Sequence, residues 1–219
     1  MFNKFILISS LIFSILCAYD GIDVSEHQGN IDFNKVKQSG KNFVIIRGGY
    51  GYTYIDPYFE QNYKNAKAAG LNVGFYWYSY GTSEDSGISE ANKALSVLKG
   101  KKFEYPIYYD VEEARSHNLG VTRVSNMINN FCSIMESNGF FCGIYASKSH
   151  FDTYFNNYVK TRFTVWVAQY YDRFTYGGDY KILQYSSTGR VGGINGNVDL
   201  DVSYEDFPSI MKDVHLNGY

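Results

Sequence analysis

Residues 105–114 read YPIYYDVEEA, an apolar and aromatic run that ends in two acidic residues, Asp110 and Glu112. Such a run is typical of a buried β-strand, and the acids stand where the strand would pass into a loop. Because alternate residues of a strand share a face, the spacing predicts that both carboxylates point the same way. Burial and a close like charge raise carboxyl pKa values, which is how proteins prepare a general acid near neutral pH. Two solvated loop acids would show the same pattern.

The strand at this position is one of several that the composition predicts. Runs rich in β-branched and aromatic residues, bounded by Gly and polar residues, recur along the chain. The predicted strands are YDGIDVS (19–25), NFVIIRGGY (42–50), NVGFYWYSY (72–80), YPIYYDVEE (105–113), FFCGIYAS (140–147), TVWVAQY (164–170), YKILQYS (180–186) and NVDLDVS (197–203).

Helical patterns follow the first five of these strands. Apolar residues recur at helical spacing, with Gly or polar residues at the ends, over residues 31–40, 56–70, 83–100, 118–139 and 150–158. The last three strands are separated instead by polar, Gly-rich gaps, for which we expect hairpin-like loops without a packed helix.

This order of elements indicates an α/β fold in one domain. Alternating strands and helices build a parallel sheet, and eight strands are enough to close it. We therefore expect an irregular TIM-like barrel that is partly antiparallel at its C-terminal end. An open doubly wound sheet is the alternative, but no Gly-rich phosphate loop follows the first strand.

The N-terminal residues 1–18 have the layout of a secretory signal peptide. Lys4 precedes an apolar run that ends in the small residues Cys17 and Ala18. We expect cleavage after Ala18, which leaves residues 19–219 as a catalytic barrel that is secreted or held in the lumen of the secretory or endolysosomal pathway. No later stretch is apolar for long enough to span a bilayer, so we expect no membrane partner after cleavage.

Cysteine content and charge narrow the remaining possibilities. After signal cleavage, Cys132 and Cys142 form an even pair, which favours one disulfide in an oxidising compartment; two free buried thiols are the alternative. The four histidines are scattered, so we expect neither a metal site nor a cofactor. A net charge of −2 argues against a nucleic-acid partner. We expect a monomer.

Acidic residues stand at the ends of further predicted strands. Asp23 ends the first strand, and Asp199 or Asp201 lies on the eighth. Since a closed barrel places its eighth strand beside its first, these carboxylates should meet Asp110 and Glu112 at one mouth, the usual site of catalysis in such barrels. Singly, Asp23 is explained as a turn residue, and Asp199 and Asp201 as residues of a half-exposed edge strand.

Glycoside hydrolysis uses this combination of groups. One protonated carboxyl protonates the leaving oxygen, and a second negative group stabilises an oxocarbenium-like centre. Aromatic rings would hold the sugars and amides would hydrogen-bond them, although a place in the core or in a turn also explains some of these residues. The candidate substrate-binding residues are Tyr76, Tyr78, Tyr145, Trp166, Gln184 and Gln28.

Six segments together resemble the lysozymes of glycoside hydrolase family 25, the Chalaropsis type. They occur in the family's order and span nearly all of residues 19–219. They are DVSEHQG (23–29), GFYWY (74–78), YYDVE (108–112), GIYAS (143–147), WVAQY (166–170) and QYSSTGRVGGINGNVDLD (184–201).

The resemblance implies a muramidase on a (β/α)5β3 barrel. Such enzymes cut the β-1,4 bond between N-acetylmuramic acid and N-acetylglucosamine in the glycan strands of bacterial peptidoglycan. Carried over by position, Glu112 matches the catalytic acid, Asp110 its partner, and Asp23 and Asp199 the further acids. The family more usually has Asn at the position of Asp201, and it often has His where this chain has Trp77.

The D-x-E spacing favours one mechanism, and two other functions remain as alternatives. We expect retention assisted by the substrate's own N-acetyl group, because an inverting route needs more room between the two carboxyls. One alternative is a catalytically silent module that binds peptidoglycan or chitin on the same barrel. A chitinase is disfavoured because residues 105–109 carry none of the acids of the longer D-x-x-D-x-D-x-E pattern.

Overall fold

The computed structural model describes residues 18–219. The predicted signal peptide, apart from its last residue, lies outside the described residues. None of the helices within 18–219 combines the length and apolar character that crossing a membrane requires.

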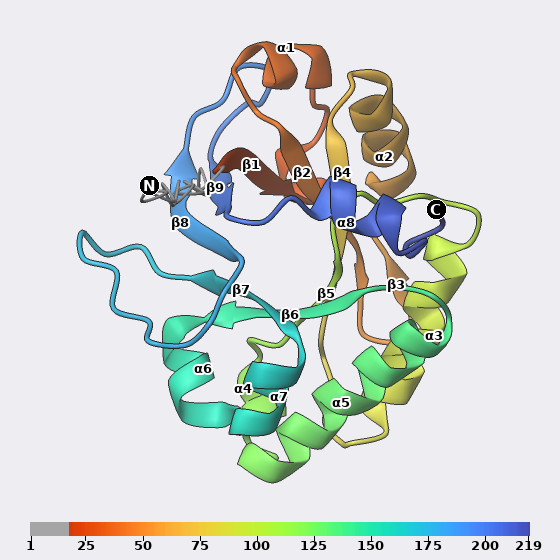
Figure 1. Cartoon of the computed structure of the whole chain (residues 1–219), viewed down its shortest axis with the longest axis vertical. Helices are drawn as coiled ribbons and strands as arrows, with labels where there is room; N and C mark the ends of the chain where they lie inside the picture. Colours follow the sequence, from red (N-terminus) through yellow and green to blue (C-terminus); the bar gives the residue numbers. More distant parts are fainter. Residues whose placement is uncertain (1–17) are drawn as a thin grey trace, which may run out of the picture.

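Within residues 18–219, one nine-stranded sheet closes into a barrel, because β1 pairs with β2 as well as with β9 (Figure 1). Eight strands form the barrel. The short β3 (Tyr54–Ile55) pairs with the end of β2 and lies outside the barrel. The barrel strands are β1 (Tyr19–Val24), β2 (Phe43–Tyr50), β4 (Asn72–Tyr78), β5 (Ile107–Asp110), β6 (Cys142–Ser147), β7 (Thr164–Ala168), β8 (Ile182–Gly189) and β9 (Val198–Ser203). All eight predicted strands and the irregular closed barrel are thus confirmed.

Strand direction differs from the prediction at one connection. Within the eight-stranded barrel, neighbouring strands from β1 to β8 run parallel, and β9 alone is antiparallel to its neighbours β8 and β1. Outside the barrel, the short β3 is antiparallel to β2. The expected hairpin between β7 and β8 is therefore wrong. Residues 169–181 instead cross over without a helix, which their length permits, because a parallel crossover needs about a dozen residues.

Helices surround the barrel, and they depart from the prediction in two ways. The predicted single helix at 150–158 is broken in two, because the Asn156 side chain accepts from the N–H of Val159 and caps a second helix. Three short helices, η1 (Glu26–Gln28, 3-10), α4 (Ala114–His117) and α8 (Phe207–Asp213), were not predicted. The helices are η1 (Glu26–Gln28, 3-10), α1 (Phe33–Gln38), α2 (Phe59–Ala68), α3 (Ser86–Leu98), α4 (Ala114–His117), α5 (Val121–Ser137), α6 (Lys148–Tyr154), α7 (Asn157–Arg162) and α8 (Phe207–Asp213).

The outer face of β5 packs against the helices as its sequence predicts. Ile107, Tyr109 and Val111 are fully buried in the core between barrel and helices. The Tyr109 ring stacks on Phe131 of α5, with centroids 4.0 Å apart. This packing turns the alternate residue, Asp110, toward the barrel interior.

Aromatic rings fill the barrel itself. Tyr76, Tyr108 and Trp166 pack together in a second buried cluster, with ring centroids 5.2 Å apart for Tyr108 and Trp166. Helix α8 closes the end from which the parallel strands start, where Phe207 lies 5.5 Å from the Tyr105 ring. Aromatic packing thus fills the barrel at the α8 end.

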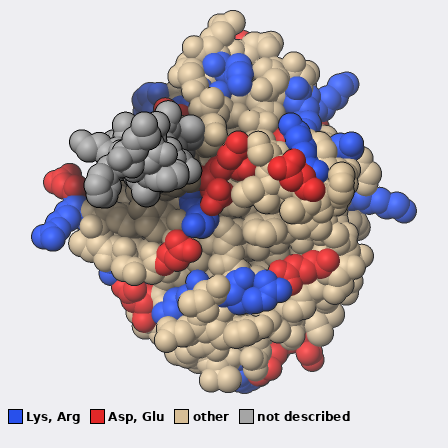
Figure 2. Space-filling model, in the orientation of Figure 1, with Lys and Arg blue, Asp and Glu red and all other residues tan. Residues whose placement is uncertain are grey.

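Exposed ion pairs contribute little to this architecture. On the face shown in Figure 2, positive and negative groups are interspersed. Exposed pairs among the described residues include Arg162–Glu136 (2.6 Å) and Lys35–Asp32 (3.4 Å). Such pairs contribute about 1 kcal/mol or less each to stability.

A disulfide joins Cys132 of α5 to Cys142 of β6, which confirms the predicted pairing. It ties the helix to the strand that follows it across ten positions of sequence.

Replacing both cysteines by alanine should lower the free energy of unfolding by about 2–4 kcal/mol, because the cross-link restricts the unfolded chain. Urea unfolding of the double variant and of the oxidised chain measures this difference. Adding a reductant during unfolding should bring the unmodified chain to the variant's midpoint and leave the variant unchanged. Equal midpoints without reductant would contradict the prediction.

Candidate active site

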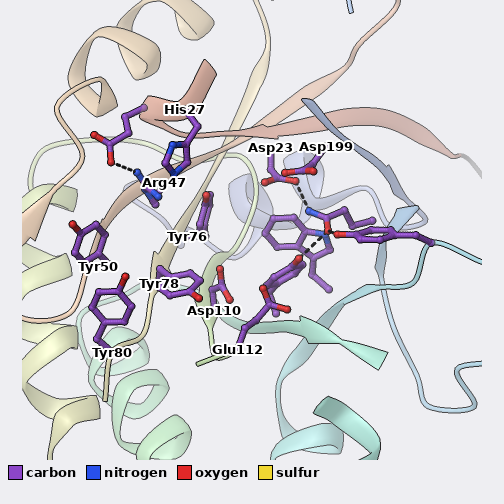
Figure 3. A pocket seen from close by; sticks show the side chains of 15 residues that line it. Asp23, His27, Arg47, Tyr50, Tyr76, Tyr78, Tyr80, Asp110, Glu112 and Asp199 are labelled. Carbon is purple, nitrogen blue, oxygen red and sulfur yellow. Dashed lines mark hydrogen bonds and ion pairs between the residues drawn. The ribbon is translucent and has the colours of Figure 1, made fainter. Parts of the chain in front are cut away.

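The C-terminal ends of the parallel strands surround a pocket of about 500 Å³ (Figure 3). This is the end of the barrel that α8 leaves open, and it is where barrels of this kind carry their sites. Its lining residues are Asp23, Glu26, His27, Arg47, Tyr50, Tyr76, Tyr78, Tyr80, Asp110, Glu112, Tyr145, Trp166, Tyr170, Gln184 and Asp199. Nine of the ten predicted catalytic and substrate-binding residues therefore meet at one pocket.

Asp110 and Glu112 line one side of the pocket. Asp110 is the last residue of β5, and Glu112 lies just beyond it. The expectation that both belong to the strand is wrong, although both side chains reach the same pocket. Oδ1 of Asp110 is buried without a hydrogen-bond partner among the described residues. An acceptor in that state is costly unless a ligand satisfies it.

Burial raises the pKa values of both carboxyls. For Asp110, burial raises the pKa well above its usual value, the Glu112 charge adds to the rise, and Arg47 opposes it. For Glu112, burial raises the pKa to about 7; the backbone N–H of Ser147 lowers it, and the Asp199 charge raises it. The pair therefore retains a proton under mildly acidic conditions.

Asp23 and Asp199 lie across the pocket from this pair (Figure 3). They are direct partners in the antiparallel register of β1 and β9. Asp201, two residues further along β9, is fully buried, does not line the pocket, and accepts from Trp166 Nε1 at 2.9 Å. The structure thus brings Asp199 rather than Asp201 to the pocket, as the family resemblance implies.

These three aspartates also have raised pKa values. Burial is the largest cause for each; for Asp23, the charges of Asp201 and Asp199 add to it. The pKa of Asp201 is raised to about 8.

Gln184 orients Asp23 through a chain of hydrogen bonds. Its Oε1 accepts from the hydroxyls of Tyr145, at 2.8 Å, and of Tyr170. With the oxygen so engaged, its Nε2 donates to Asp23 Oδ2 at 2.6 Å. The two tyrosines therefore determine the orientation of the amide, and the amide positions the carboxyl.

Arg47 is the cation of the pocket, and the sequence prediction missed it. Its Nε donates to Asp56 Oδ2 at 2.9 Å and its Nη2 to Glu26 Oε1 at 2.7 Å. It lies on β2, and a search of every strand end for charged residues of either sign would have found it. The other lining residues that were not singled out are Glu26, His27, Tyr50, Tyr80 and Tyr170.

Gln28 is the predicted binding residue that does not line the pocket. Its Oε1 accepts from the N–H of Ser25 at 2.9 Å, and its Nε2 donates to the carbonyl of Asn197 at 3.4 Å. The first bond closes the turn after β1, and the second ties that turn to the residue before β9, so Gln28 has the turn role that was its alternative explanation.

Asp201→Asn should flatten the pH dependence of stability. Between the usual aspartate pKa and about 8, the folded chain keeps a proton on Asp201 that the unfolded chain has released. Stability therefore falls as pH rises through this window. Asn still accepts from Trp166 and does not titrate, so Tm at pH 8 should rise by roughly 2–4 °C for each kcal/mol relieved. Thermal unfolding at pH 5 and pH 8 tests this, and an unchanged slope would contradict it.

Comparison with known proteins agrees with this geometry. The sequence model of the glycosyl hydrolases family 25 matches residues 22–194. The autolytic lysozyme of Clostridium acetobutylicum is 31% identical over 182 residues, which cover 83% of this chain and 54% of the relative. This chain thus spans about half the length of that relative.

Two solved structures are similar over most of this chain. The bacterial lysozyme from Streptomyces coelicolor superposes with a TM-score of 0.71 at 28% identity, covering 84% of this chain and 90% of that one. The modular autolysin LytC from Streptococcus pneumoniae, in complex with a synthetic peptidoglycan ligand, gives 0.77 at 28% identity, covering 84% and 46%. The match of the family model over most of the barrel shows that this chain belongs to the glycosyl hydrolases family 25.

Proposed function

We propose that this protein is a lysozyme that hydrolyses the β-1,4 bond between N-acetylmuramic acid and N-acetylglucosamine in bacterial peptidoglycan. The observation that carries the proposal is the meeting of Asp23, Asp110, Glu112 and Asp199 at one pocket. Membership of the family supports it, as do a relative named as a lysozyme and a similar structure that holds a peptidoglycan ligand.

In this proposal Glu112 is the general acid. A pKa of about 7 keeps its proton available at mildly acidic pH, and the proton passes to the glycosidic oxygen as the bond to the anomeric carbon breaks. Burial raises the pKa of Asp110, and the Arg47 charge opposes that rise. In the proposal the pair shares one proton, which Glu112 carries when the sugar is bound, while Arg47 helps Asp110 to bear the negative charge.

Asp110 would assist the substrate's own N-acetyl group. The acetamido oxygen attacks the anomeric carbon and forms a cyclic oxazolinium ion, while the acetamido N–H donates to the unpartnered Oδ1 of Asp110. Water then opens the ring, and Glu112 takes its proton, so the sugar keeps its configuration. An inverted first product, detected by NMR, would contradict this route.

The remaining lining residues would bind the sugar chain. Asp23 and Asp199, whose pKa values burial raises, can hydrogen-bond the sugar chain from the far side. Aromatic faces pack well on sugar rings. The proposed contacts are Tyr76, Tyr78, Tyr145, Trp166 and Gln184.

Release of reducing sugar from purified peptidoglycan and from chitin tests the proposed substrate. We expect release from peptidoglycan and none from chitin, with a rate that falls as pH rises through about 7, where Glu112 loses its proton. Release from chitin alone would indicate a chitinase. Binding to peptidoglycan without release would indicate a silent module.

We also propose that the protein is secreted after removal of residues 1–18. The charged start and apolar run of this segment support the proposal. Mass spectrometry of the protein exported by a eukaryotic host should find Tyr19 at the N-terminus; an exported chain that retains residues 1–18 would contradict it.

A further inference from the structure

A pair of histidines lies behind Glu112, outside the pocket lining. His150 is on α6, and His117 is the last residue of α4; their ring centroids are 4.3 Å apart. Nδ1 of His150 lies 3.8 Å from Oε1 of Glu112. Neither histidine lines the pocket, although His150 follows the end of β6 by three residues and His117 follows Glu112 by five.

His117 and Tyr154 hold His150 in this place. Nε2 of His117 lies 3.3 Å from the carbonyl of Val111, the residue before Glu112, and donates to it in the neutral tautomer. Tyr154 of α6 stacks flat on the His117 ring, with centroids 4.1 Å apart. The cluster thus fixes both the backbone before Glu112 and the imidazole beside its carboxyl.

Nδ1 of His150 is buried and has no hydrogen-bond partner among the described residues. The rest of the side chain reaches solvent, since it is 25% exposed. The nitrogen facing solvent can bond to water, whereas Nδ1 depends on the carboxyl of Glu112. A separation of 3.8 Å is longer than a hydrogen bond, but bonds in empty active sites are often long and tighten when substrate binds.

The surrounding charges determine which ring nitrogen carries the proton. Burial and His117 lower the pKa of His150 to about 4, so the ring is neutral at working pH and has one N–H. Glu112 faces Nδ1, and Asp110 and Asp199 lie beyond it around the pocket. Once Glu112 has given up its proton, its negative charge favours an N–H on Nδ1 that points toward it.

The other titratable groups near this cluster have partners of their own. Glu113 acts on His117 and raises its pKa, opposing burial, which lowers it. Lys148, on the same helix as His150, is paired with Asp152. Tyr154 is occupied by stacking on His117. Among the described groups at this cluster, Glu112 is therefore the acceptor that Nδ1 faces.

We propose that His150 is a positioning residue for Glu112: its Nδ1–H donates to Oε1 when the pocket is occupied, so that the acid's proton is held on the other carboxyl oxygen. The proposal rests on the proposed function, in which Glu112 is the general acid. A donor to the carboxyl also stabilises its ionised form and lets the acid release its proton more easily.

The pH–rate profile of wall hydrolysis tests this with three variants. His150→Phe keeps a flat ring and removes both nitrogens, and His150→Gln keeps a neutral N–H donor. His215→Asn is the matched control, because His215 is exposed and has a φ of 55°, a conformation that Asn tolerates.

In His150→Phe, the alkaline limb should move up by about one pH unit, because the ionised carboxyl loses a donor and is more deeply buried. The rate below the limb should fall about 10-fold from lost orientation. His150→Gln should restore most of the limb's position and most of the rate. His215→Asn should have the same pH–rate profile as the unmodified chain. An unmoved or lowered limb in His150→Phe, or a Gln variant no better than Phe, would overturn the proposal.

Imidazole ¹⁵N NMR of the folded chain tests the contact between His150 Nδ1–H and Glu112 without any measurement of activity. Nδ1 of His150 should carry the proton, and its chemical shift should follow the titration of Glu112 near pH 7; Glu112→Gln should abolish that inflection. An unprotonated Nδ1, or an inflection that persists in Glu112→Gln, would overturn the proposal. If the unmodified chain releases no sugar from walls, the proposed function fails, and this titration still decides the contact.

Discussion

Glu112→Gln should reduce the rate of wall clearing at pH 5 by about 10²–10⁴-fold, the usual contribution of a positioned general acid. Gln has the shape of Glu and cannot give a proton to the glycosidic oxygen. The initial loss of turbidity of a bacterial wall suspension, with reducing ends counted in parallel, measures the effect. Clearing at the unmodified rate would show that Glu112 is not the acid.

Glu113→Gln is the matched control for this experiment. Glu113 is the next residue, lies outside the pocket lining, and accepts from the Tyr78 hydroxyl at 3.0 Å, which the amide oxygen of Gln can also do. Its rate should stay close to that of the unmodified chain. Glu112→Gln should also be the more stable protein at pH 8, because a carboxyl with a folded pKa of about 7 destabilises the fold once it ionises.

Asp110→Asn should lower the rate by about 10²–10³-fold, the loss expected when one preorganised electrostatic contact to a transition state is removed. Asn keeps the size of Asp, but it brings no negative charge to the developing cation. In the substrate-assisted route it also gives the acetamido N–H a weaker acceptor. Single-turnover rates on a soluble muropeptide oligomer separate this loss from weaker binding.

The pH profile gives Asp110→Asn a second readout. Asp110 and Glu112 each disfavour the other's ionisation, so removing the Asp110 charge should move the alkaline limb of activity to lower pH. A variant that loses rate without this movement would place Asp110 too far from Glu112 to act on its proton. A variant with the unmodified rate would exclude Asp110 from the reaction.

Much of the fold was predictable because its elements are encoded locally. Buried strands of a parallel barrel are continuous β-branched and aromatic runs, and all eight were found. The parallel pairing of β7 and β8 was not predictable in this way, since a Gly-rich gap of about a dozen residues suits a long hairpin as well as a crossover. The capping role of Asn156, which divides one expected helix into two, was likewise missed.

The site was predictable where residues stand at strand ends. Asp23 and Asp110 follow from that rule, and the family resemblance distinguished Asp199 from Asp201. Arg47 was missed because the search considered acids and ring faces, although the same rule applied to β2 would include it. His150 had no local signal at all, because its contact with Glu112 depends on how α6 packs behind the loop after β5.

The central claim is that the protein hydrolyses the bond that leaves N-acetylmuramic acid, rather than N-acetylglucosamine, as the new reducing end. The identity of that reducing end tests the claim most directly. Purified peptidoglycan is digested, reduced with borohydride and hydrolysed, and the reduced amino sugars are identified by mass spectrometry. The account predicts muramitol, with none formed by Glu112→Gln. Glucosaminitol in its place, or digestion without any new reducing end, would contradict it.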